Sequence, residues 1–464
     1  MAPSKKSATK KAAKKAAKKT AKKAAKKPSG GSANARLEAQ TIRVRMYRVG
    51  FGDCFLLSLP AAKGSGSADT HHHVLVDCGV HFGGDINTMD RAVANIAAVT
   101  GGRLAAVIAT HSHQDHISGF GKFGEEFGRL DIAEVWLPWC ENPRSPAALK
   151  LQRKHAALAE MLGQHFDAQR AAGVAAAQTP QRAAAAAAVA NISGNQKALQ
   201  LLRSGFGVGA EVRYLEAGQV LRDPAGVEGL TVRVLGPPRD QKFLSKMDPP
   251  KDQRYLRAGA AGGVEVENAL QPFPAKWVVN PQAPNYPGPV LSREERDELK
   301  DSLSDTELDG LAFALDQVKN NTSLVTLFVF RGKYLLFPGD AQYGNWKFWL
   351  DQEEAEEILP RISFLKVAHH GSHNATPRSA LERMAEGGFA AMVSTQSVPW
   401  DSIPRVPLMK RLREKATKGV VRSDWLKLAD APGPLANTEP PVPKRLPADF
   451  KKGAFWYDYL LRLK

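Results

Sequence analysis

The stretch Thr110-His111-Ser112-His113-Gln114-Asp115-His116 decides the expected fold and chemistry of this chain. It follows the apolar run 104–109, which predicts a buried strand. Imidazoles and carboxylates bind zinc, manganese and iron, so three histidines and an aspartate at a strand end predict a metal site. In an extended turn His111 and His113 share one side and can share one ion, while Asp115 and His116 reach towards a second. A polar surface loop is disfavoured, because this stretch holds a quarter of the 12 histidines.

Length and composition are those of a large globular protein. With 464 residues, 43% of them hydrophobic and 24% charged, the chain exceeds one average domain. No apolar run approaches the roughly 18–20 residues of a membrane helix, so we expect no membrane partner. Three widely spaced cysteines without a CxxC pair argue against disulfides and predict a cytoplasmic protein. Cys78 stays open as a metal ligand, although an apolar core position is favoured.

The basic charge is concentrated in an N-terminal tail. Residues 1–27 hold 12 lysines and no acidic residue, which leaves +5 of the net charge of +17 for the other 437 residues. Repulsion at this density predicts a disordered tail and linker over residues 1–32. The tail resembles the lysine- and alanine-rich tails of linker-histone-like bacterial proteins, and such lysines bind nucleic-acid phosphates without reading sequence.

Two alternatives to nucleic-acid binding by the tail stay open. It can be a solubilising extension, and a membrane surface fits less well because the tail has no apolar anchor. The lysines expected to contact nucleic acid are Lys10, Lys11, Lys14, Lys15, Lys18, Lys19, Lys22, Lys23, Lys26 and Lys27.

Strands and helices are expected to interleave along the rest of the chain, which predicts an α/β layered fold. The alternating pattern of 41–47 predicts a half-buried strand, the alanine-rich segment 145–205 a helical insertion, and 237–290 a long excursion of loops. Further strands are expected at 54–59, 73–79, 104–109, 132–137, 211–215, 219–221, 230–235, 324–330, 333–337, 362–367 and 390–394, and helices at 87–99, 292–318 and 408–415.

Two later strands also end in metal-binding residue types. Asp340 follows the strand 333–337, and His369 and His370 follow the strand 362–367. Each alone is a weak signal, since an acid at a strand end often caps a helix. Together with the histidine stretch they offer His, Asp and His at three strand ends, which one sheet edge can bring together.

These segments resemble the metallo-β-lactamase fold superfamily, and within it the hydrolase domain of competence DNA-uptake channel proteins and their soluble relatives. The resemblance runs in order from about residue 41 to 425 and leaves out the tail and both excursions. It implies a four-layer αββα sandwich over residues 38–464, with metals at one edge of the sheets. The matching segments are 49–53, 76–79, 111–116, 320–325, 338–341, 366–372 and 420–424.

The resemblance also implies roles for individual residues. His111 and His113 would bind a first divalent ion, Zn²⁺ or Mn²⁺, and a water activated by two such ions would be the nucleophile. The second ion would be bound by Asp115, His116 and His370, with Asp340 between the two ions and Asp115 also counted as catalytic.

Several polar residues near these segments have more than one interpretation. His369 is expected to face the substrate as an acid or phosphate donor, with a supporting hydrogen-bonding role as the alternative. Asp77 is expected to orient a ligand histidine. Asp53 is expected to pin the first hairpin near the site, with catalysis as the lesser option. Lys366 and His373 can contact a phosphate or fill ordinary strand and surface positions.

One departure concerns the third histidine that many superfamily members supply to the first metal. Between His116 and Asp340 this chain has only His155 and His165, which are expected to be exposed residues of the helical insertion. The competence-type subfamily tends to lack that ligand too. We therefore expect a more open first metal position. Asn320 is interpreted first as part of a turn, with a site-facing role as secondary.

The leading functional hypothesis is a metal-dependent phosphodiesterase, a nuclease acting on DNA or RNA that the tail helps to bind. The second is a small-molecule ester, phosphoester or lactone hydrolase with a non-catalytic tail, because one fold serves many substrates. The third is a nucleoid-binding protein with an inactive metal domain. The expected location is the cytoplasm, with association to the nucleoid under the first and third hypotheses, and the oligomeric state is left open.

Overall fold

The computed structural model describes residues 40–61, 70–173, 180–255, 305–385, 388–400, 402–428 and 445–463. The chain divides into two compact units, Met1–Glu38 and Ala39–Lys464. The lysine-rich tail lies outside the described residues, as do most of the predicted loop excursion 237–290 and the first part of the predicted helix 292–318. All that follows concerns the second unit.

The first sheet has eight strands in the order β14-β15-β1-β2-β3-β4-β5-β6. Its strands pair antiparallel from β14 to β3 and parallel from β3 to β6. The parallel half brings several carboxyl ends to one edge. The strands are β1 Thr41–Tyr47, β2 Cys54–Pro60, β3 His71–Cys78, β4 Arg103–Ile108, β5 Asp131–Pro138, β6 Glu211–Leu215, β14 Phe450–Lys452 and β15 Trp456–Arg462.

The second sheet has seven strands in the order β13-β12-β11-β10-β9-β8-β7. It pairs antiparallel from β7 to β10 and parallel from β10 to β13. Its strands are β7 Val220–Arg222, β8 Leu230–Gly236, β9 Val325–Phe330, β10 Lys333–Phe337, β11 Ile362–Lys366, β12 Ala390–Val393 and β13 Val420–Arg422.

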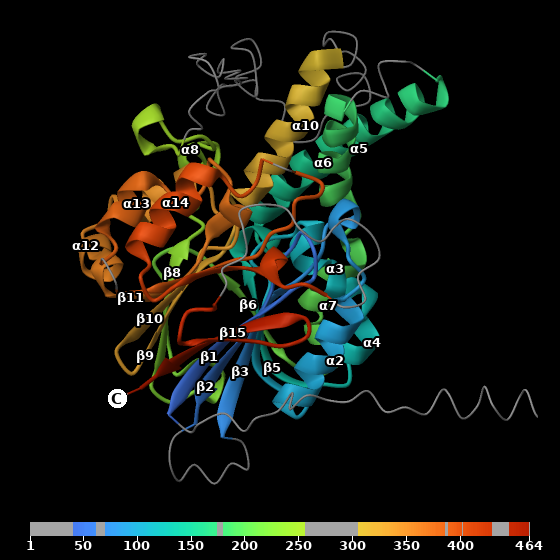
Figure 1. Cartoon of the computed structure of the whole chain (residues 1–464). Coiled ribbons are helices and arrows are strands. Elements are labelled where there is room, and N and C mark those ends of the chain that lie inside the picture. The colour runs from blue at the N-terminus through green and yellow to red at the C-terminus, as the bar shows by residue number, and fades with distance from the viewer. Residues whose placement is uncertain are drawn as a thin grey trace, which may run out of the picture. The chain divides into compact units, whose positions relative to one another are not determined.

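The two sheets pack face to face and helices cover both outer faces, which confirms the four-layer αββα sandwich (Figure 1). Between the sheets lies an apolar core that includes Phe55, Trp136, Phe328 and Phe337. The first sheet is covered by α2 Met89–Thr100, α3 Gln114–Lys122, α4 Gly124–Phe127 and α7 Gln196–Arg203. The second is covered by α11 Tyr343–Leu350, α12 Glu354–Ile358, α13 Arg378–Arg383 and α14 Val406–Lys415.

A further group of helices has its own small core. The helices α5 Pro146–Ala171, α6 Pro180–Ser193 and α10 Asp305–Asn320 pack together (Figure 1) through side chains that include Leu162, Val189 and Leu315. The helical character expected for 145–205 is therefore present, although its last helix, α7, belongs to the layer over the first sheet. Because α10 leads directly into β9, this group fixes the residues that precede β9.

The prediction that 41–47 forms a half-buried strand is wrong. All seven residues of β1 are buried, because its apolar side faces the core between the sheets and Arg45 on the other side is covered by Asn95 of α2 and the ring of Trp456. Arg45 is accommodated by a two-pronged contact with Asp458, whose oxygens lie 2.7 and 2.8 Å from its nitrogens. A charged residue on this strand therefore marks a buried ion pair rather than a solvent-facing side.

Three further observations bear on the sequence interpretation. His155 is buried in α5 rather than exposed, and burial lowers its pKa to about 3. Cys54, Cys78 and Cys140 are all buried and free, and the Cys78 thiol lies 3.5 Å from the sulfur of Met89. Among the described residues, no helix has the length and apolar character needed to span a bilayer.

Candidate metal centre

The histidine stretch lies between a strand and a helix. β4 ends at Ile108 and α3 begins at Gln114, so His111 and His113 belong to the loop and Asp115 to the first helical turn. Asp77, just before the end of β3, holds the start of this loop, because its carboxylate accepts bonds of 2.7 Å from the Thr110 amide and 2.8 Å from the Thr110 hydroxyl. Two neighbouring parallel strands thus fix the stretch in place.

The second sheet contributes its residues from the loops after β10 and β11. Asp340 follows Gly339, which has a φ of +56°. The amide of Asp340 donates to Ser323 Oγ at 3.1 Å. His369 and His370 lie beyond the end of β11 in a short 3₁₀ turn, with φ values of 47° and 52°. They therefore lie after the strand, as expected, but in a turn rather than in extended backbone. Both have left-handed backbone conformations, which are uncommon away from glycine.

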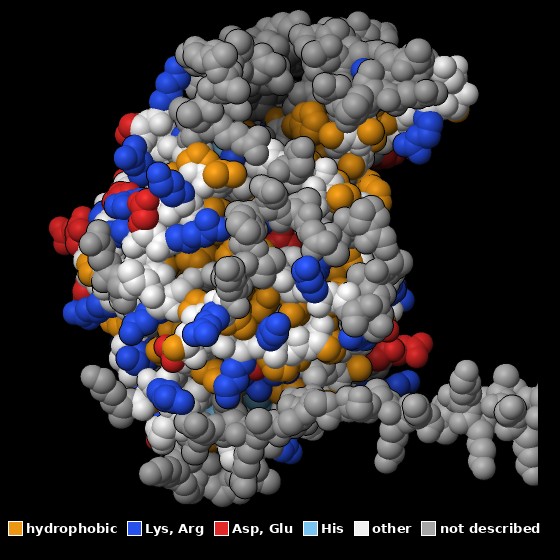
Figure 2. Space-filling view, viewed as in Figure 1, with side chains coloured by type: hydrophobic (Ala, Val, Ile, Leu, Met, Phe, Trp, Pro, Cys, Tyr) orange, Lys and Arg blue, Asp and Glu red, His pale blue; other side chains and the backbone are white. Residues whose placement is uncertain are grey.

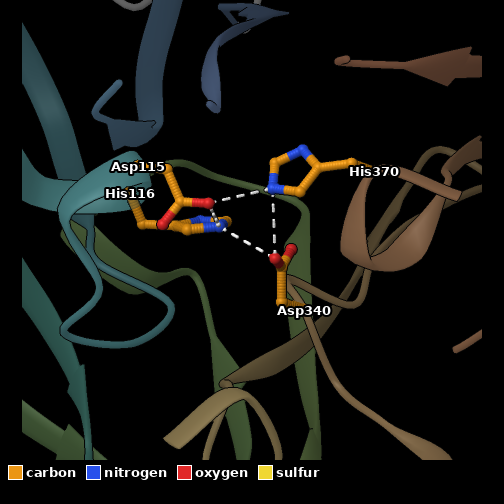
Figure 3. A group of neighbouring side chains, drawn as sticks. All are labelled: Asp115, His116, Asp340 and His370. Carbon is orange, nitrogen blue, oxygen red and sulfur yellow. Dashed lines mark hydrogen bonds and ion pairs between the residues drawn. The ribbon is translucent and has the colours of Figure 1, made fainter. Parts of the chain in front are cut away.

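Four of these residues form a compact group that we call the carboxylate half of the centre: Asp115, His116, Asp340 and His370. One donor atom from each lies within 4.8 Å of all the others, and all four side chains are buried. His370 Nε2 is 3.1 Å from Asp115 Oδ2 and 3.2 Å from Asp340 Oδ2, and His116 Nε2 is 3.1 Å from Asp340 Oδ2. The side chains point towards a common centre from α3 and from the two loops (Figure 3).

His111 and His113 form the second part, which we call the imidazole half. His111 Nε2 lies 3.0 Å from His113 Nδ1, and both side chains are buried. The His111 ring lies 4.2 Å from the His116 ring, centroid to centroid, so the two halves are adjacent. All six residues that the sequence predicts as metal ligands are thus brought to one edge of the sandwich.

Hydrogen bonds fix which nitrogen each histidine turns to the centre. His116 Nδ1 donates to Asp77 Oδ2 at 2.8 Å, and His370 Nδ1 donates to the Ser394 carbonyl at 2.9 Å. The Thr110 hydroxyl gives its only hydrogen to Asp77, so it accepts from His111 Nδ1 at 3.2 Å. The Nε2 atoms of these three histidines therefore face inward and can supply lone pairs to a metal.

Electrostatics differ between the halves. Burial opposes the charged form of His370, but Asp340 and Asp115 outweigh it and raise its pKa to about 10. The pKa of His116 is likewise raised well above its ordinary value, and those of Asp115 and Asp340 are lowered. The carboxylate half thus favours positive charge at its centre, which a divalent cation supplies.

The imidazole half shows the opposite behaviour. Burial lowers the pKa of His113 to about 3, and burial with the neighbouring His116 lowers that of His111. Both rings are neutral at pH 7, and neutral imidazole is the form that binds metals.

The donor set fits a divalent ion. Two imidazole nitrogens and two carboxylate oxygens converge in the carboxylate half, a mixture typical of zinc and manganese sites. Within the described part of the chain, Asp115 Oδ1 is buried and has no hydrogen-bond partner, which leaves a further oxygen for a cation.

Lys366 and Asp53 form an ion pair that contacts Asp340 of the carboxylate half. Lys366 is buried, its Nζ pairs with the Asp53 carboxylate, and it lies 3.1 Å from Asp340 Oδ1 and 2.9 Å from the Gly339 carbonyl. These contacts use all three of its N–H groups, so the interpretation of Lys366 as a substrate contact is disfavoured. The Asp53 amide donates to the Asp115 carbonyl at 2.9 Å, which attaches the first hairpin to the site.

The two remaining candidates differ in position. His369 Nδ1 lies 3.1 Å from Asn374 Oδ1, and its Nε2 lies 3.4 Å from Asn320 Nδ2, beside the metal centre. Burial lowers the pKa of His369 to about 4, so the ring is neutral. His373 pairs with Asp248 at 3.4 Å and is one-third exposed, which is an ordinary surface arrangement.

The sequence interpretation missed the contribution of the helices α6 and α10. Asn191 Oδ1 accepts a 2.9 Å bond from the Gln114 amide, and Asn195 Nδ2, just after α6, donates to the Ser112 carbonyl at 2.8 Å. From α10, the Lys319 ammonium donates to the Ser112 hydroxyl at 2.9 Å. The helical insertion therefore helps to hold the histidine stretch.

Asp316 and Asn320, also on α10, reach the imidazole half. Asp316 Oδ1 lies 3.4 Å from His113 Nε2, and Asn320 Oδ1 lies 3.0 Å from His113 Nδ1. The available signal was their spacing, because residues four apart share one face of a helix.

Comparison with known proteins agrees with this architecture. The sequence model of a family described as Metallo-beta-lactamase superfamily matches residues 68–133, the segment that carries the histidine stretch. The two-sheet sandwich is consistent with that fold. No match was found among curated proteins. The match and the buried donor group together support a metal-dependent hydrolase in general.

Proposed function

We propose that the protein is a hydrolase that uses two divalent metal ions, Zn²⁺ or Mn²⁺, to cleave phosphodiester bonds of DNA or RNA. The observation that carries the proposal is the convergence of Asp115, His116, Asp340 and His370, with His111 and His113 adjacent to them. Two ions held in this way would lower the pKa of a shared water and stabilise charge on a phosphorus centre.

The surrounding residues would hold this arrangement during the reaction. Lys366 fixes Asp340 through Oδ1, so that Oδ2 faces His116 and His370. Asp77 keeps Nε2 of His116 directed inward. The neutral His369 gives its one ring proton to Asn374 Oδ1 through Nδ1, so its Nε2 could donate to a phosphate oxygen only after taking up a second proton and leaving the contact with Asn320. The contact between His369 Nδ1 and Asn374 Oδ1 would keep the His369 ring in its orientation.

The choice of nucleic acid as substrate comes from the sequence. The ten lysines spaced through Lys10–Lys27 would bind phosphates by counterion release. On the face drawn in Figure 2, lysine and arginine side chains are spread among uncharged ones, so that surface adds no strong preference of its own. Association with the nucleoid and the likeness to competence DNA-uptake proteins rest on this same reasoning and remain predictions.

A small-molecule ester or lactone hydrolase is the second candidate, and an aromatic cluster beside the metal centre favours it. The Phe51 ring lies 4.4 Å from the His370 ring, and Trp400 lies 4.8 Å from Phe51. Phe82 nearby is 58% exposed. The exposed part of this cluster suits an apolar acyl or alkyl group, although it also suits a stacked base.

The test is cleavage of plasmid, single-stranded DNA, RNA and a panel of esters and lactones by the full chain with Mn²⁺ or Zn²⁺, beside the Asp340→Ala variant. We expect nucleic-acid cleavage that the variant loses. Turnover of esters alone would support the second candidate, and binding without cleavage would support a nucleoid-binding protein with an inactive metal domain. Deletion of residues 1–32 should weaken nucleic-acid binding without lowering metal content. The slope of log K against the logarithm of the salt concentration should become shallower by about 0.9 for each phosphate contact that is lost.

A further inference from the structure

The imidazole half has two histidines where a stable metal position needs at least three ligands. Among the described residues, no group of converging His, Cys, Asp or Glu donor atoms combines His111 and His113 with His155 or His165, both of which belong to α5. Instead, the last residue of α10, Asn320, is buried and places its carbonyl oxygen 3.0 Å from His113 Nδ1. His111 Nε2 lies at the same distance, 3.0 Å, from that nitrogen.

These spacings match those of atoms around a common ion. Ligand atoms about 2.1 Å from a metal lie roughly 3.0–3.4 Å from one another in octahedral or tetrahedral geometry. The three atoms concerned are His111 Nε2, His113 Nδ1 and Asn320 Oδ1. The two distances from His113 Nδ1 to the other atoms, both 3.0 Å, lie at the lower end of that range.

The orientation of the Asn320 amide follows from its other contacts. Its nitrogen lies 3.5 Å from Asp316 Oδ2 and 3.4 Å from His369 Nε2, both of which can accept a hydrogen bond. Its oxygen is therefore the end that faces His113.

Asp316 lies beside the other ring nitrogen of His113, with its Oδ1 3.4 Å from Nε2. If a metal binds Nδ1, the ring proton must be on Nε2, where it faces this carboxyl group. One carboxylate on α10 thereby orients two groups, His113 and the Asn320 amide four residues further on. Asp316 is in turn contacted by Asn191 Nδ2 of α6 at 3.4 Å.

With the His113 proton on Nε2, lone pairs on His111 Nε2 and Asn320 Oδ1 would each lie 3.0 Å from that on His113 Nδ1, an arrangement that a cation between them would stabilise. We propose that Asn320 supplies the third ligand of the first metal position through Oδ1, in place of the missing histidine, and that Asp316 is its positioning residue. The inference rests on the proposed metal-dependent function. A neutral amide oxygen is a harder ligand than imidazole, so this position accepts Mn²⁺ more readily relative to Zn²⁺ than a three-histidine position does.

The test measures metal binding by the full chain, not activity alone. Metal-free wild type, Asn320→Leu, Asn320→Asp and His113→Ala are titrated with Mn²⁺, followed by electron paramagnetic resonance, and with Zn²⁺, followed by metal analysis after dialysis. We expect two ions per chain in wild type. Asn320→Leu should lower the affinity for the ion that binds second by ~10-fold or more, as His113→Ala should. Asn320→Asp should retain both ions because it keeps an oxygen ligand.

Circular dichroism and thermal unfolding of the metal-free variants serve as the folding control. If Asn320→Leu binds two ions with wild-type affinity, the inference is wrong while the proposed function stands. If wild type binds no metal, both are wrong. If Asn320→Leu does not fold, Asn320→Asp decides between the outcomes. Its added negative charge must raise the affinity for the more weakly bound Mn²⁺ ion several-fold. An unchanged affinity contradicts ligation by residue 320.

Discussion

The two halves of the metal centre are built from the same kind of strand-end segments, yet they treat charge in opposite ways. In the carboxylate half, Asp115 and Asp340 raise the pKa of His370 to about 10. In the imidazole half, burial lowers the pKa of His113 to about 3. The difference shows that the two carboxylates, and not the histidines that both halves contain, determine how strongly each half attracts a cation. Anionic partners attract the ion before any bond forms, and neutral buried ligands rely on the bonds themselves.

The largest effect should separate the halves directly. His370→Ala removes a ligand from the carboxylate half, and we expect hydrolysis to fall on the order of 10³-fold, because a metal contributes several kcal/mol to charge stabilisation. His113→Ala should cost less, and excess Mn²⁺ should restore part of its activity, since the other ion stays in place. Steady-state rates across a Mn²⁺ titration measure both.

His373→Ala is the matched control, because His373 pairs with Asp248 at the surface and should retain the wild-type rate. Equal losses for His370→Ala and His113→Ala, with equal recovery on adding metal, would remove the distinction between the halves.

Residues that orient the ligands should give intermediate effects. Asp77→Asn weakens the hydrogen bond that orients His116, and Asp316→Asn weakens the contact that orients His113. Loss of such partners typically costs about 10–100-fold in metal affinity. Asp77 should show the larger loss, because its contact with His116 is 2.8 Å against 3.4 Å for Asp316. Competitive chelator titrations of the folded variants measure both constants, and the reversed order would contradict the ranking.

The sequence predicted the fold and the main donor residues because both depend on local pattern. Apolar runs ending in His or Asp placed His111, Asp340 and His370 at strand ends, and parallel strands carry their carboxyl ends to one edge. The bounds expected for β1, β6 and β10 agree with the structure residue for residue.

What the sequence did not reveal depends on packing between distant segments. Asn191 and Asp316 lie 125 positions apart and meet only because α6 and α10 share a core. The burial of Arg45 similarly depends on Asp458, near the other end of the chain. The left-handed backbone at His369 and His370 was not predicted, because local propensity gives no sign of such a conformation at residues other than glycine.

The smallest expected effect is on the pH dependence of folding in the metal-free protein. The pKa of His370 is raised in the fold, so the stability from its proton is full below about pH 6.5 and is lost as pH rises towards about 10. The pKa of His113 is lowered, so its contribution is present above about pH 6.5 and is lost as pH falls towards about 3. Urea unfolding in a chelator should therefore show that His370→Gln flattens the alkaline side of the stability profile and His113→Gln the acid side. Profiles that shift in parallel with wild type would mean that the halves do not differ in charge preference.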